Sequence, residues 1–347
     1  MAGRKKIKQR RLKVVLAGKV AAKALDELRA LIKVPAVLSA FPVNHDDPKM
    51  LKALPAADVI VGHFFTERMA RAARDLKLLQ APNAGTDAHK IDLLPQRTTV
   101  ANAYFHGPAI AEYVVMMVLV FSRNLLNMDA WFRKGIWEGS WATGKAPAAE
   151  VLGKSLGLVG YGTIGREVAA RARALGMSIK VVSAHPPKRK PRDVDFWKSP
   201  AALPQLLQES DYVVLACPLN KETQGVMGPR EFGQMKRSAF LINVARGAVV
   251  QEEALYRALK DRRIAGAAID VWYRYPKDDE PCRPSGFPFH KLDNVVMTPH
   301  VSGWMAGTRN QRLQLVAENI NRLVAGKSLL NVVQGPRKHG HVECNAR

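Results

Sequence analysis

The stretch Leu156–Gly165, LGLVGYGTIG, joins a short apolar segment to a Gly-x-Gly-x-x-Gly turn, and a helical pattern, Arg166–Leu175, follows at once. Gly160 allows the tight turn, Gly162 lets the backbone approach a phosphate, and Gly165 lets the helix pack closely on the strand. The N-terminus of that helix offers free N–H groups to an anion. The stretch therefore predicts a site for the pyrophosphate of a dinucleotide cofactor.

Length and composition are typical of a two-domain protein with large cores. The chain has 347 residues, of which 47% are hydrophobic, so general disorder is excluded. Its three cysteines, Cys217, Cys282 and Cys344, form no closely spaced pair, and we expect neither a disulfide framework nor a metal site. The pattern shows no secretory signal, and the apolar run Tyr113–Phe121 is far too short to span a bilayer. We therefore expect a cytoplasmic protein without a membrane partner.

The charge balance is strongly basic. Lys and Arg number 53 against 30 Asp and Glu, which gives a net charge of +23, and such a field favours anionic ligands. Part of the excess lies in three runs, at residues 4–11, 188–192 and 337–339. We interpret the terminal runs as solvated tails. Because no aromatic residues are interleaved with these charges, no nucleic-acid partner is predicted.

Short apolar segments alternate with helical patterns on both sides of the glycine-rich stretch. In the first half we expect strands at 12–17, 37–41, 58–61, 76–80 and 99–101, with helices at 21–32, 48–54 and 66–73. In the second half we expect strands at 156–159, 179–182, 212–217, 240–243, 267–270 and 295–298, with a helix at 252–260. A long apolar helix, Pro108 to about Asn127, separates the halves, and an amphipathic helix is expected at about 309–325. This alternation predicts an α/β fold with helices on both faces of parallel sheets.

The order of the patterns predicts two Rossmann-like doubly wound domains. Residues 12–106 and 309–335 form a discontinuous, flavodoxin-like substrate domain, because the last helix is long enough to cross back onto the first series of strands. Residues 107–308 form the inserted cofactor domain, and residues 1–11 and 336–347 are basic tails. We expect the ligand cleft between the domains, at the carboxyl ends of the strands.

Two polar residues follow predicted strands directly. Arg246 stands in the sequence NVARG, and its guanidinium fork can hold a carboxylate and polarise a neighbouring carbonyl. His300 stands in the sequence TPHVSG, and imidazole is the natural proton donor to a carbonyl oxygen at neutral pH. Either residue alone is explained more simply by a surface ion pair or a structural histidine. Two such residues at strand ends, after a dinucleotide motif, predict a catalytic pair.

From about residue 12 to 335 the chain resembles the D-isomer-specific 2-hydroxyacid dehydrogenase family. The resemblance rests on several motifs in the family order, which are NAGTD at 83–87, AE at 111–112, the glycine turn, CPL at 217–219, Thr223, NVARG at 243–247, GAAIDVW at 266–272 and residues 294–300. It implies an NAD(P)-dependent oxidoreductase that interconverts a small 2-oxo acid, such as glyoxylate or hydroxypyruvate, and the D-2-hydroxy acid. It also implies a homodimer, for which the helix from Pro108 is a candidate contact.

The same resemblance implies roles for individual residues. Arg246 binds and activates the 2-oxo acid, and His300 is the acid/base. Backbone amides around Ala84 and Gly85 hold the substrate carboxylate, and Asp270 contacts the nicotinamide carboxamide. The residues implied to line the rest of the cofactor are Gly160, Gly162, Thr163, Ile164, Gly165, Pro218, Thr223, Ala245 and Gly303.

The chain departs from the family pattern beside the catalytic histidine. Where the family has Asp-Val-Phe-x-x-Glu-Pro, residues 270–276 read DVWYRYP, so Tyr275 stands in the glutamate slot. A neutral phenol can hydrogen-bond to imidazole but supplies no negative charge. We therefore predict a lower working pKa for His300 than in members with the glutamate. The alternative is that Asp278, Asp279 or Glu280 substitutes through a reshaped loop.

A second departure concerns the choice of cofactor. The segment 181–190, VVSAHPPKRK, has no acid for the ribose hydroxyls of NAD. Ser183, His185, Lys188 or Arg189 would bind a 2′-phosphate instead. We predict NADP(H) as the cofactor; the alternative is NAD(H), with residues 188–192 forming only a solvated loop.

A third departure is His106, which stands where formate dehydrogenases of the superfamily have an asparagine that binds substrate. It either touches the substrate or caps the following helix. Two alternative functions remain, a formate-dehydrogenase-like enzyme and a non-catalytic, cofactor-sensing regulatory protein, since the fold also serves transcriptional co-repressors. The presence of both Arg246 and His300 argues against the sensor.

Overall fold

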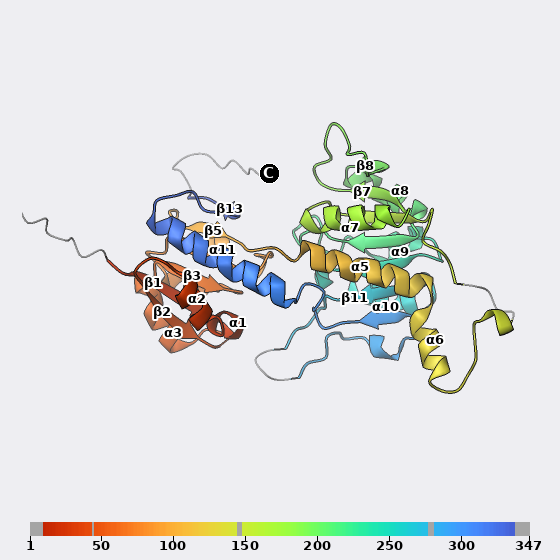
Figure 1. Ribbon diagram of the computed structural model, residues 1–347, viewed down its shortest axis with the longest axis horizontal. Helices are drawn as coiled ribbons and strands as arrows, with labels where there is room; N and C mark the ends of the chain where they lie inside the picture. Colours follow the sequence, from red (N-terminus) through yellow and green to blue (C-terminus); the bar gives the residue numbers. More distant parts are fainter. Residues whose placement is uncertain (1–9, 44, 144–147, 277–280, 337–347) are drawn as a thin grey trace, which may run out of the picture. The chain divides into compact units, whose positions relative to one another are not determined.

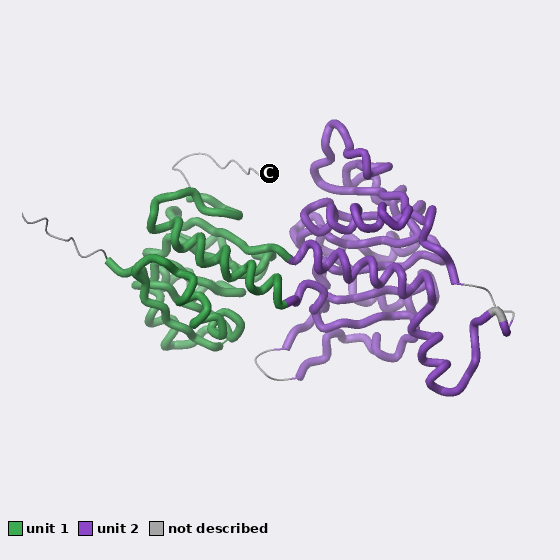
Figure 2. Tube along the Cα trace, in the orientation of Figure 1, with its two compact units in different colours: residues 1–105, 277–280, 306–347 green, residues 106–276, 281–305 purple. Residues whose placement is uncertain are grey.

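The structure is a computed structural model and describes residues 10–43, 45–143, 148–276 and 281–336 (Figure 1). The chain divides into two compact units (Figure 2). The first unit takes in the described residues of 1–105 and 306–347, and the second unit takes in residues 106–276 and 281–305. The proposed alternative carboxylates Asp278, Asp279 and Glu280, and most of the basic tails, lie outside the described residues.

The first unit contains a six-stranded sheet in the order β13-β5-β4-β3-β1-β2. Its strands are β1 (Leu12–Ala17), β2 (Ala36–Phe41), β3 (Val59–Gly62), β4 (Leu78–Gln80), β5 (Thr99–Ala101) and β13 (Val332–Gln334). Strands β1 to β5 are parallel in the order 2-1-3-4-5, which is the flavodoxin-like topology that the sequence predicts. The added strand β13 runs antiparallel to β5, and it is not among the predicted strands.

Helices cover both faces of this sheet because side chains alternate along each strand. On one face, Leu16 packs with Leu28 of α2 (Leu25–Leu31) and Ile320 of α11 (Ala306–Val324). On the other face, Val15 and Ile60 pack with the helices α3 (Pro48–Ala53) and α4 (Glu67–Ala72). Burial on both sides explains why the strands read as continuous apolar runs.

Two predicted helices are interrupted. The helix expected at 21–32 is split into α1 (Lys19–Ala22) and α2, because Ala24 has a non-helical backbone. The helix expected from Pro108 to Asn127 is α5 (Gly107–Ser122), followed by α6 (Leu125–Phe132). Asn124 breaks it by adopting a left-handed conformation with φ 49°, which asparagine tolerates. Among the described residues no single helix is long and apolar enough to cross a membrane, although α5 and α6 together, bent by 60°, meet that length and composition.

The second unit contains a seven-stranded parallel sheet in the order β12-β11-β10-β9-β6-β7-β8. Its strands are β6 (Ser155–Val159), β7 (Ser178–Val182), β8 (Phe196–Lys198), β9 (Tyr212–Leu215), β10 (Phe240–Asn243), β11 (Gly266–Ile269) and β12 (Val295–Met297). The first six strands follow the 3-2-1-4-5-6 order of a dinucleotide-binding domain, which is the type of domain that the sequence predicts. Strand β8 is a three-residue element that the sequence does not reveal.

Two layers of helices cover the second sheet. Helices α5 and α7 (Thr163–Ala174) lie side by side on one face (Figure 1), where Val114 and Val168 join one core cluster. Helices α8 (Leu203–Glu209), α9 (Pro229–Gln234) and α10 (Glu252–Lys260) supply the cluster on the other face. A Cβ on Gly107 would lie 2.9 Å from Thr163 Cγ2, so α5 and α7 pack closely at the N-terminus of α7.

Candidate active site

The glycine turn connects β6 to α7. Gly160 has φ 99°, and a Cβ there would lie 2.7 Å from the backbone nitrogen of Cys217. A Cβ on Gly165 would lie 2.6 Å from the Gly160 carbonyl oxygen, so the helix reaches the strand only because glycine has no side chain. By contrast, the space beside Gly162 is open, and α7 begins at Thr163 without a side-chain cap. Exposed N–H groups beside an open approach fit the pyrophosphate of a dinucleotide.

Arg246 is held by the turn that follows β10. The Asn243 side chain accepts a hydrogen bond from Ala245 N (3.1 Å) and donates one to Arg246 O (3.2 Å). The guanidinium donates from Nη1 to Ala245 O at 2.8 Å. A Cβ on the next residue, Gly247, would lie only 2.3 Å from Trp272 O. The turn therefore fixes Arg246 beside the carboxyl end of β11.

The loop that carries His300 is held by a fully buried carboxylate. Asp270, 0% exposed, accepts hydrogen bonds from Thr298 Oγ1 (2.6 Å), Val301 N (2.9 Å) and Ser302 N (3.0 Å). Between these donors His300 adopts a left-handed backbone with φ 57°, a conformation that persists only where its surroundings impose it. Asp270 thus anchors the loop on both sides of the histidine.

Tyr113 of α5 extends this network. Its hydroxyl lies 2.9 Å from Thr298 Oγ1. Thr298 gives its only proton to the Asp270 carboxylate, which is solely an acceptor, so Tyr113 donates to Thr298. Burial raises the pKa of Tyr113 to about 12, although its hydrogen bond to Thr298 acts in the opposite direction, and the charge of Asp270 acts in the same direction as burial. Tyr113 therefore remains a donor and ties α5 to the loop that carries His300.

His300 has Tyr275 as its neighbour at Nδ1. The Tyr275 hydroxyl lies 2.9 Å from His300 Nδ1 and accepts a hydrogen bond from Trp272 N at 3.2 Å. The two rings are tilted by 58° with centroids 5.6 Å apart. His300 is exposed, and Tyr275 is 46% exposed. The residue in the glutamate slot of the sequence therefore does contact the histidine.

The segment after β7 carries the residues predicted to select the cofactor. Ser183 Oγ accepts a hydrogen bond from Trp197 Nε1 of β8 at 2.8 Å. The centroid of the Trp197 ring in turn lies 4.4 Å from the ring centroid of Tyr161 in the glycine turn. Lys188 is exposed. The Ser183 oxygen accepts the indole hydrogen bond on one side. The hydroxyl proton of Ser183 therefore remains available to a ligand.

Farther along the second unit, the Thr223 hydroxyl donates to Pro218 O at 2.6 Å and closes the turn after β9. His106 occupies the N-cap position of α5, but its side chain makes no capping hydrogen bond, so the capping interpretation is wrong. Gly303 lies close to His106: a Cβ added to Gly303 would be 3.0 Å from His106 Cβ. His106 and Gly303 thus lie against each other.

Ala84 and Gly85 belong to the first unit, in the loop after β4. The Asn83 side chain donates to Gly85 O at 2.7 Å, and the Asn102 side chain donates to Ala84 O at 2.8 Å. Both carbonyl groups of the predicted carboxylate-binding loop are therefore fixed. Sequence reasoning missed Asn102, although its position directly after β5 matches that of other polar residues at strand ends.

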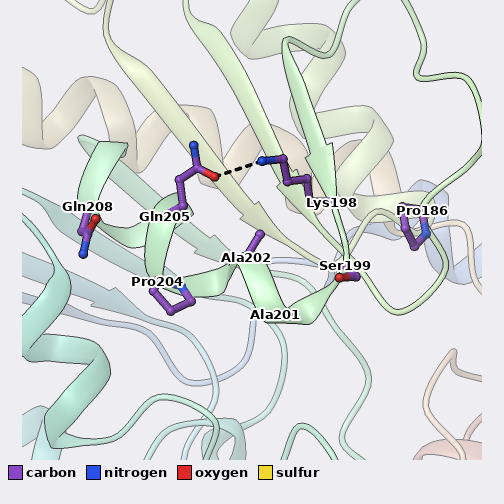
Figure 3. Close-up of a pocket in the computed structure, with 8 residues that line it drawn as sticks. All are labelled: Pro186, Lys198, Ser199, Ala201, Ala202, Pro204, Gln205 and Gln208. Atoms are coloured by element: carbon purple, nitrogen blue, oxygen red, sulfur yellow. Dashed lines mark hydrogen bonds between the residues drawn. The ribbon is translucent and has the colours of Figure 1, made fainter.

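The structure thus places the glycine turn, Arg246, Asp270, Tyr275 and His300 in the second unit, and Ala84 with Gly85 in the first. A surface hollow beside β8 contains none of these residues (Figure 3). It is lined by Pro186, Lys198, Ser199, Ala201, Ala202, Pro204, Gln205 and Gln208. Lys198 Nζ donates to Gln205 Oε1 at 3.2 Å across it.

Comparison with known proteins decides the family. The NAD binding domain of D-isomer specific 2-hydroxyacid dehydrogenases matches residues 115–302. The chain belongs to the D-isomer specific 2-hydroxyacid dehydrogenase family. A glyoxylate reductase of this kind from Thermofilum pendens is 34% identical over 74% of this chain and 74% of its own length.

Other dehydrogenases of the family align over a smaller part of their length. A glyoxylate reductase from Korarchaeum cryptofilum is 35% identical over 64% of this chain and 65% of its own length. A D-3-phosphoglycerate dehydrogenase from Archaeoglobus fulgidus is 32% identical over 83% of this chain and 53% of its own. The chain therefore spans less than two thirds of the length of these two relatives.

Solved structures agree with the family assignment. An acyclic imino acid reductase in complex with NADPH and D-Arg has a TM-score of 0.78 at 25% identity, covering 93% of this chain and 100% of that one. A glyoxylate reductase from Paecilomyes thermophila has a TM-score of 0.77 at 25% identity, covering 94% and 99%. A Granulicella formate dehydrogenase shares the fold. It has a TM-score of 0.76 at 21% identity, covering 92% of this chain and 85% of that one.

Proposed function

We propose that the protein is an NAD(P)-dependent oxidoreductase that interconverts a small 2-oxo acid and its D-2-hydroxy acid. The observation that carries this proposal is the placement of three polar side chains after three adjacent strands of one sheet. Arg246 follows β10, Asp270 follows β11 and His300 follows β12. Because parallel strands end at the same edge of a sheet, these residues gather where α/β folds bind ligands.

The proposed chemistry assigns a distinct task to each side chain. When bound, the reduced nicotinamide supplies a hydride to C2 of the 2-oxo acid. His300 delivers a proton to the carbonyl oxygen, and Arg246 stabilises the negative charge that develops on that oxygen. In the oxidative direction His300 accepts the proton. Asp270 acts on the reaction through the His300 loop that it holds; its contact with the nicotinamide carboxamide remains a proposal from the family resemblance.

Tyr275 sets the tautomer of His300 in this scheme. Its oxygen can accept hydrogen bonds from both Trp272 N and His300 Nδ1. When His300 donates from Nδ1 to Tyr275, the neutral ring has no proton on Nε2, so Nε2 accepts a proton from the hydroxy acid, and in the imidazolium Nε2 delivers one to the 2-oxo acid. We propose that Tyr275 takes the place of the family glutamate and orients the histidine without adding a negative charge.

The loop after β4 would bind the substrate carboxylate through backbone amides. A peptide group is planar, and its N–H points opposite to its C=O. Because Asn102 holds Ala84 O and Asn83 holds Gly85 O, the N–H groups of Gly85 and Thr86 are fixed in direction. Fixed N–H groups are suited to a carboxylate because they need no reorganisation when it binds.

We favour NADP(H) over NAD(H) as the cofactor. No acid follows β7, and Ser183 is oriented by Trp197 so that its proton is free to meet a 2′-phosphate. His185, Lys188 and Arg189 follow in the same exposed segment. The solved imino acid reductase that resembles this chain contains NADPH. In this proposal Thr163, Ile164, Pro218, Thr223, Ala245 and Gly303 line the remainder of the cofactor.

We further propose glyoxylate or hydroxypyruvate as the type of substrate and a second copy of the chain as partner. The named relatives include several glyoxylate reductases. On α5 and α6 the apolar side chains of Met116, Leu125, Leu126 and Phe132 are exposed. Exposed apolar groups concentrated on two consecutive helices are typical of a protein interface.

The decisive experiment is a substrate and cofactor panel. NADPH and NADH are each incubated with glyoxylate, hydroxypyruvate and pyruvate, and NAD(P)⁺ with formate, while nicotinamide absorbance is followed. We expect turnover of a 2-oxo acid, and a loss of about 10²- to 10⁴-fold in kcat for H300Q. H290Q, which changes an exposed histidine elsewhere in the same unit, serves as the control. Tight NADPH binding without turnover of any acid would favour the sensor, and turnover of formate alone the formate dehydrogenase.

A further inference from the structure

The carboxylate that opens α10 lies between the two elements that carry the proposed reaction. Glu252 is the first residue of α10 and follows Arg246 closely in the sequence. The single turn Gly247–Val249 connects them, and Gly247 and Val249 are both buried in it. Val249 belongs to the core cluster of the second unit. The half-buried side chain of Glu252 therefore starts from a segment that is fixed by close packing.

The Glu252 carboxylate holds residues that come after Tyr275 in the chain. Its Oε1 accepts hydrogen bonds from Ser285 Oγ at 2.6 Å and from Gly286 N at 2.7 Å. Ser285 Oγ in turn accepts a hydrogen bond from Phe287 N at 2.9 Å. Hydrogen bonds to a charged acceptor are strong, and a carboxylate is favoured in the first turn of a helix. These returning residues are therefore tied to the start of α10.

The part of the chain that leads away from β11 is joined to the returning residues. Arg274 N donates to Pro284 O at 3.1 Å. A Cβ added to Gly286 would lie 3.3 Å from Arg274 Nη2 and 3.8 Å from Glu252 Oε1, so these three residues meet. Burial raises the pKa of the Tyr273 hydroxyl, and the negative charge of Glu252 acts in the same direction. Glu252 therefore lies beside both arms of the loop.

We propose that Glu252 is a positioning residue for the reaction, because it holds the loop from which Tyr275 reaches His300. The Tyr275 hydroxyl lies 2.9 Å from His300 Nδ1, although the Tyr275 side chain is 46% exposed. An exposed side chain keeps one geometry only where its backbone is held, because ordering costs entropy. The backbone is held at Arg274 by Pro284, next to the residues that bind Glu252. The inference rests on the proposed function and adds to it a residue that acts through Tyr275.

A titration of His300 tests this role without turnover. The pKa of its imidazole is measured by NMR on the intact protein, and H300Q assigns the signal. We expect E252A and Y275F to lower this pKa to a similar extent, because in each the imidazolium loses the same hydrogen-bond acceptor. E252Q removes the charge but keeps an oxygen for the two donors, so it should titrate like the wild type. A shift in E252Q equal to that in E252A overturns the positioning role, since it then comes from charge alone.

Two further variants complete the titration. E253A removes the neighbouring carboxylate, which forms an ion pair with Arg257 on the surface of α10, and should leave the pKa of His300 unchanged. S285A removes one of the two donors to Glu252 and leaves the carboxylate in place. It should shift the pKa in the same direction as E252A but less, and it carries the test if E252A does not fold. Unchanged values in E252A and S285A overturn the proposal.

A kinetic double-mutant cycle tests whether Glu252 acts through Tyr275. We expect E252A to lower kcat for the 2-oxo acid about three- to tenfold, the effect of one hydrogen bond. The KM values of the 2-oxo acid and the cofactor should stay within about twofold, because the loop is not assigned to binding either. In the Y275F background E252A should cause no further loss, since the partner that it positions is already absent. Equal losses in both backgrounds overturn the proposal.

The outcomes separate this inference from the proposed function. Turnover of a 2-oxo acid with additive effects of E252A and Y275F retains the dehydrogenase and overturns the positioning role. Turnover of no acid refutes the proposed function, and with it the role of Glu252 in the reaction. In that case the titration still shows whether Glu252 holds Tyr275 against His300.

Discussion

His300 combines a strained backbone with a partner that can both donate and accept a proton. Its left-handed φ is imposed by the hydrogen bonds of Asp270 on either side of it. Tyr275 can donate to the neutral imidazole and accept from the protonated one, since a phenol has both capacities. It therefore orients either form of His300 but adds no Coulombic stabilisation to the imidazolium, which a carboxylate would supply.

This difference predicts the pH dependence of the reaction. Reduction requires protonated His300, so kcat/KM for the 2-oxo acid should fall as pH rises through the apparent pKa of the catalytic acid. We expect Y275E to move that fall to higher pH, by about one unit or more, because a carboxylate favours the imidazolium. Y275F controls for loss of the hydroxyl and should not move the fall upward. Coincident pH profiles of kcat/KM for the wild type and Y275E would refute the assignment.

His63, which directly follows β3, predicts a pH dependence of folding. Burial lowers its pKa from 6.5 to about 4 in the folded chain, so between these values the unfolded chain binds more protons. The free energy of unfolding should therefore fall as pH is lowered from about 6.5 to about 4, by at most roughly 3 kcal/mol from this residue. Urea denaturation over this range should show a shallower pH dependence for H63Q than for the wild type or H290Q. Parallel curves for H63Q and the wild type would contradict the buried neutral state.

At the scale of elements, prediction succeeds where a signal is local. The bounds of β10 and α10 agree with the sequence prediction because alternation and helical periodicity each span the whole element. The strands β8 and β13 are not predicted. Each lies at an edge of its sheet, outside the regular alternation of strands and helices, whereas the equally short β4, β5 and β12 belong to that alternation. The break between α5 and α6 depends on the left-handed conformation of Asn124. The sequence does not reveal it, because an asparagine can also continue a helix.

In the candidate site too, the sequence predicts only what a local signal marks. Arg246 and His300 are recognisable because each directly follows a strand, and strand ends meet at one edge. Asn102 also directly follows a strand, but its hydrogen-bond partner, like that of Trp197, is set only by folding. Asn102 holds a carbonyl 18 residues away, and Trp197 reaches Ser183 across 14 residues. No spacing rule relates such partners.

The loop after β12 offers a prediction about an element held by one side chain. D270N keeps the shape of Asp270 but replaces one acceptor oxygen with an NH₂ group that faces an existing donor. Losing a charged acceptor should cost about 1.5–3 kcal/mol and lower kcat. Hydrogen exchange should quicken at the amides of Val301 and Ser302. D261N, a change at an exposed acid after α10, should leave both measurements unchanged, whereas unchanged exchange in D270N would exclude the clamp.

For the whole molecule, the excess of positive charge bears on cofactor choice. A net charge of +23 attracts anions in general, so tight binding of NADPH alone does not reveal a dedicated 2′-phosphate site. Long-range attraction weakens with ionic strength for both cofactors. A local site, by contrast, depends on particular side chains after β7. Discrimination between NADPH and NADH at moderate salt therefore isolates the local contribution.

The final prediction places an acid in the site that lacks one. S183D puts a carboxylate where the ribose 2′ position is expected, so it should repel a 2′-phosphate and accept hydrogen bonds from a 2′-hydroxyl. We expect the ratio of kcat/KM for NADPH to that for NADH to exceed one in the wild type and to fall about tenfold or more in S183D. S238D adds the same charge at an exposed position before β10, at the opposite edge of the parallel sheet, and should leave the ratio within about twofold, because distant charges are screened at 0.15 M salt. A wild type that uses NADH at least as efficiently would mean that the cations after β7 contribute only to the general field of the molecule.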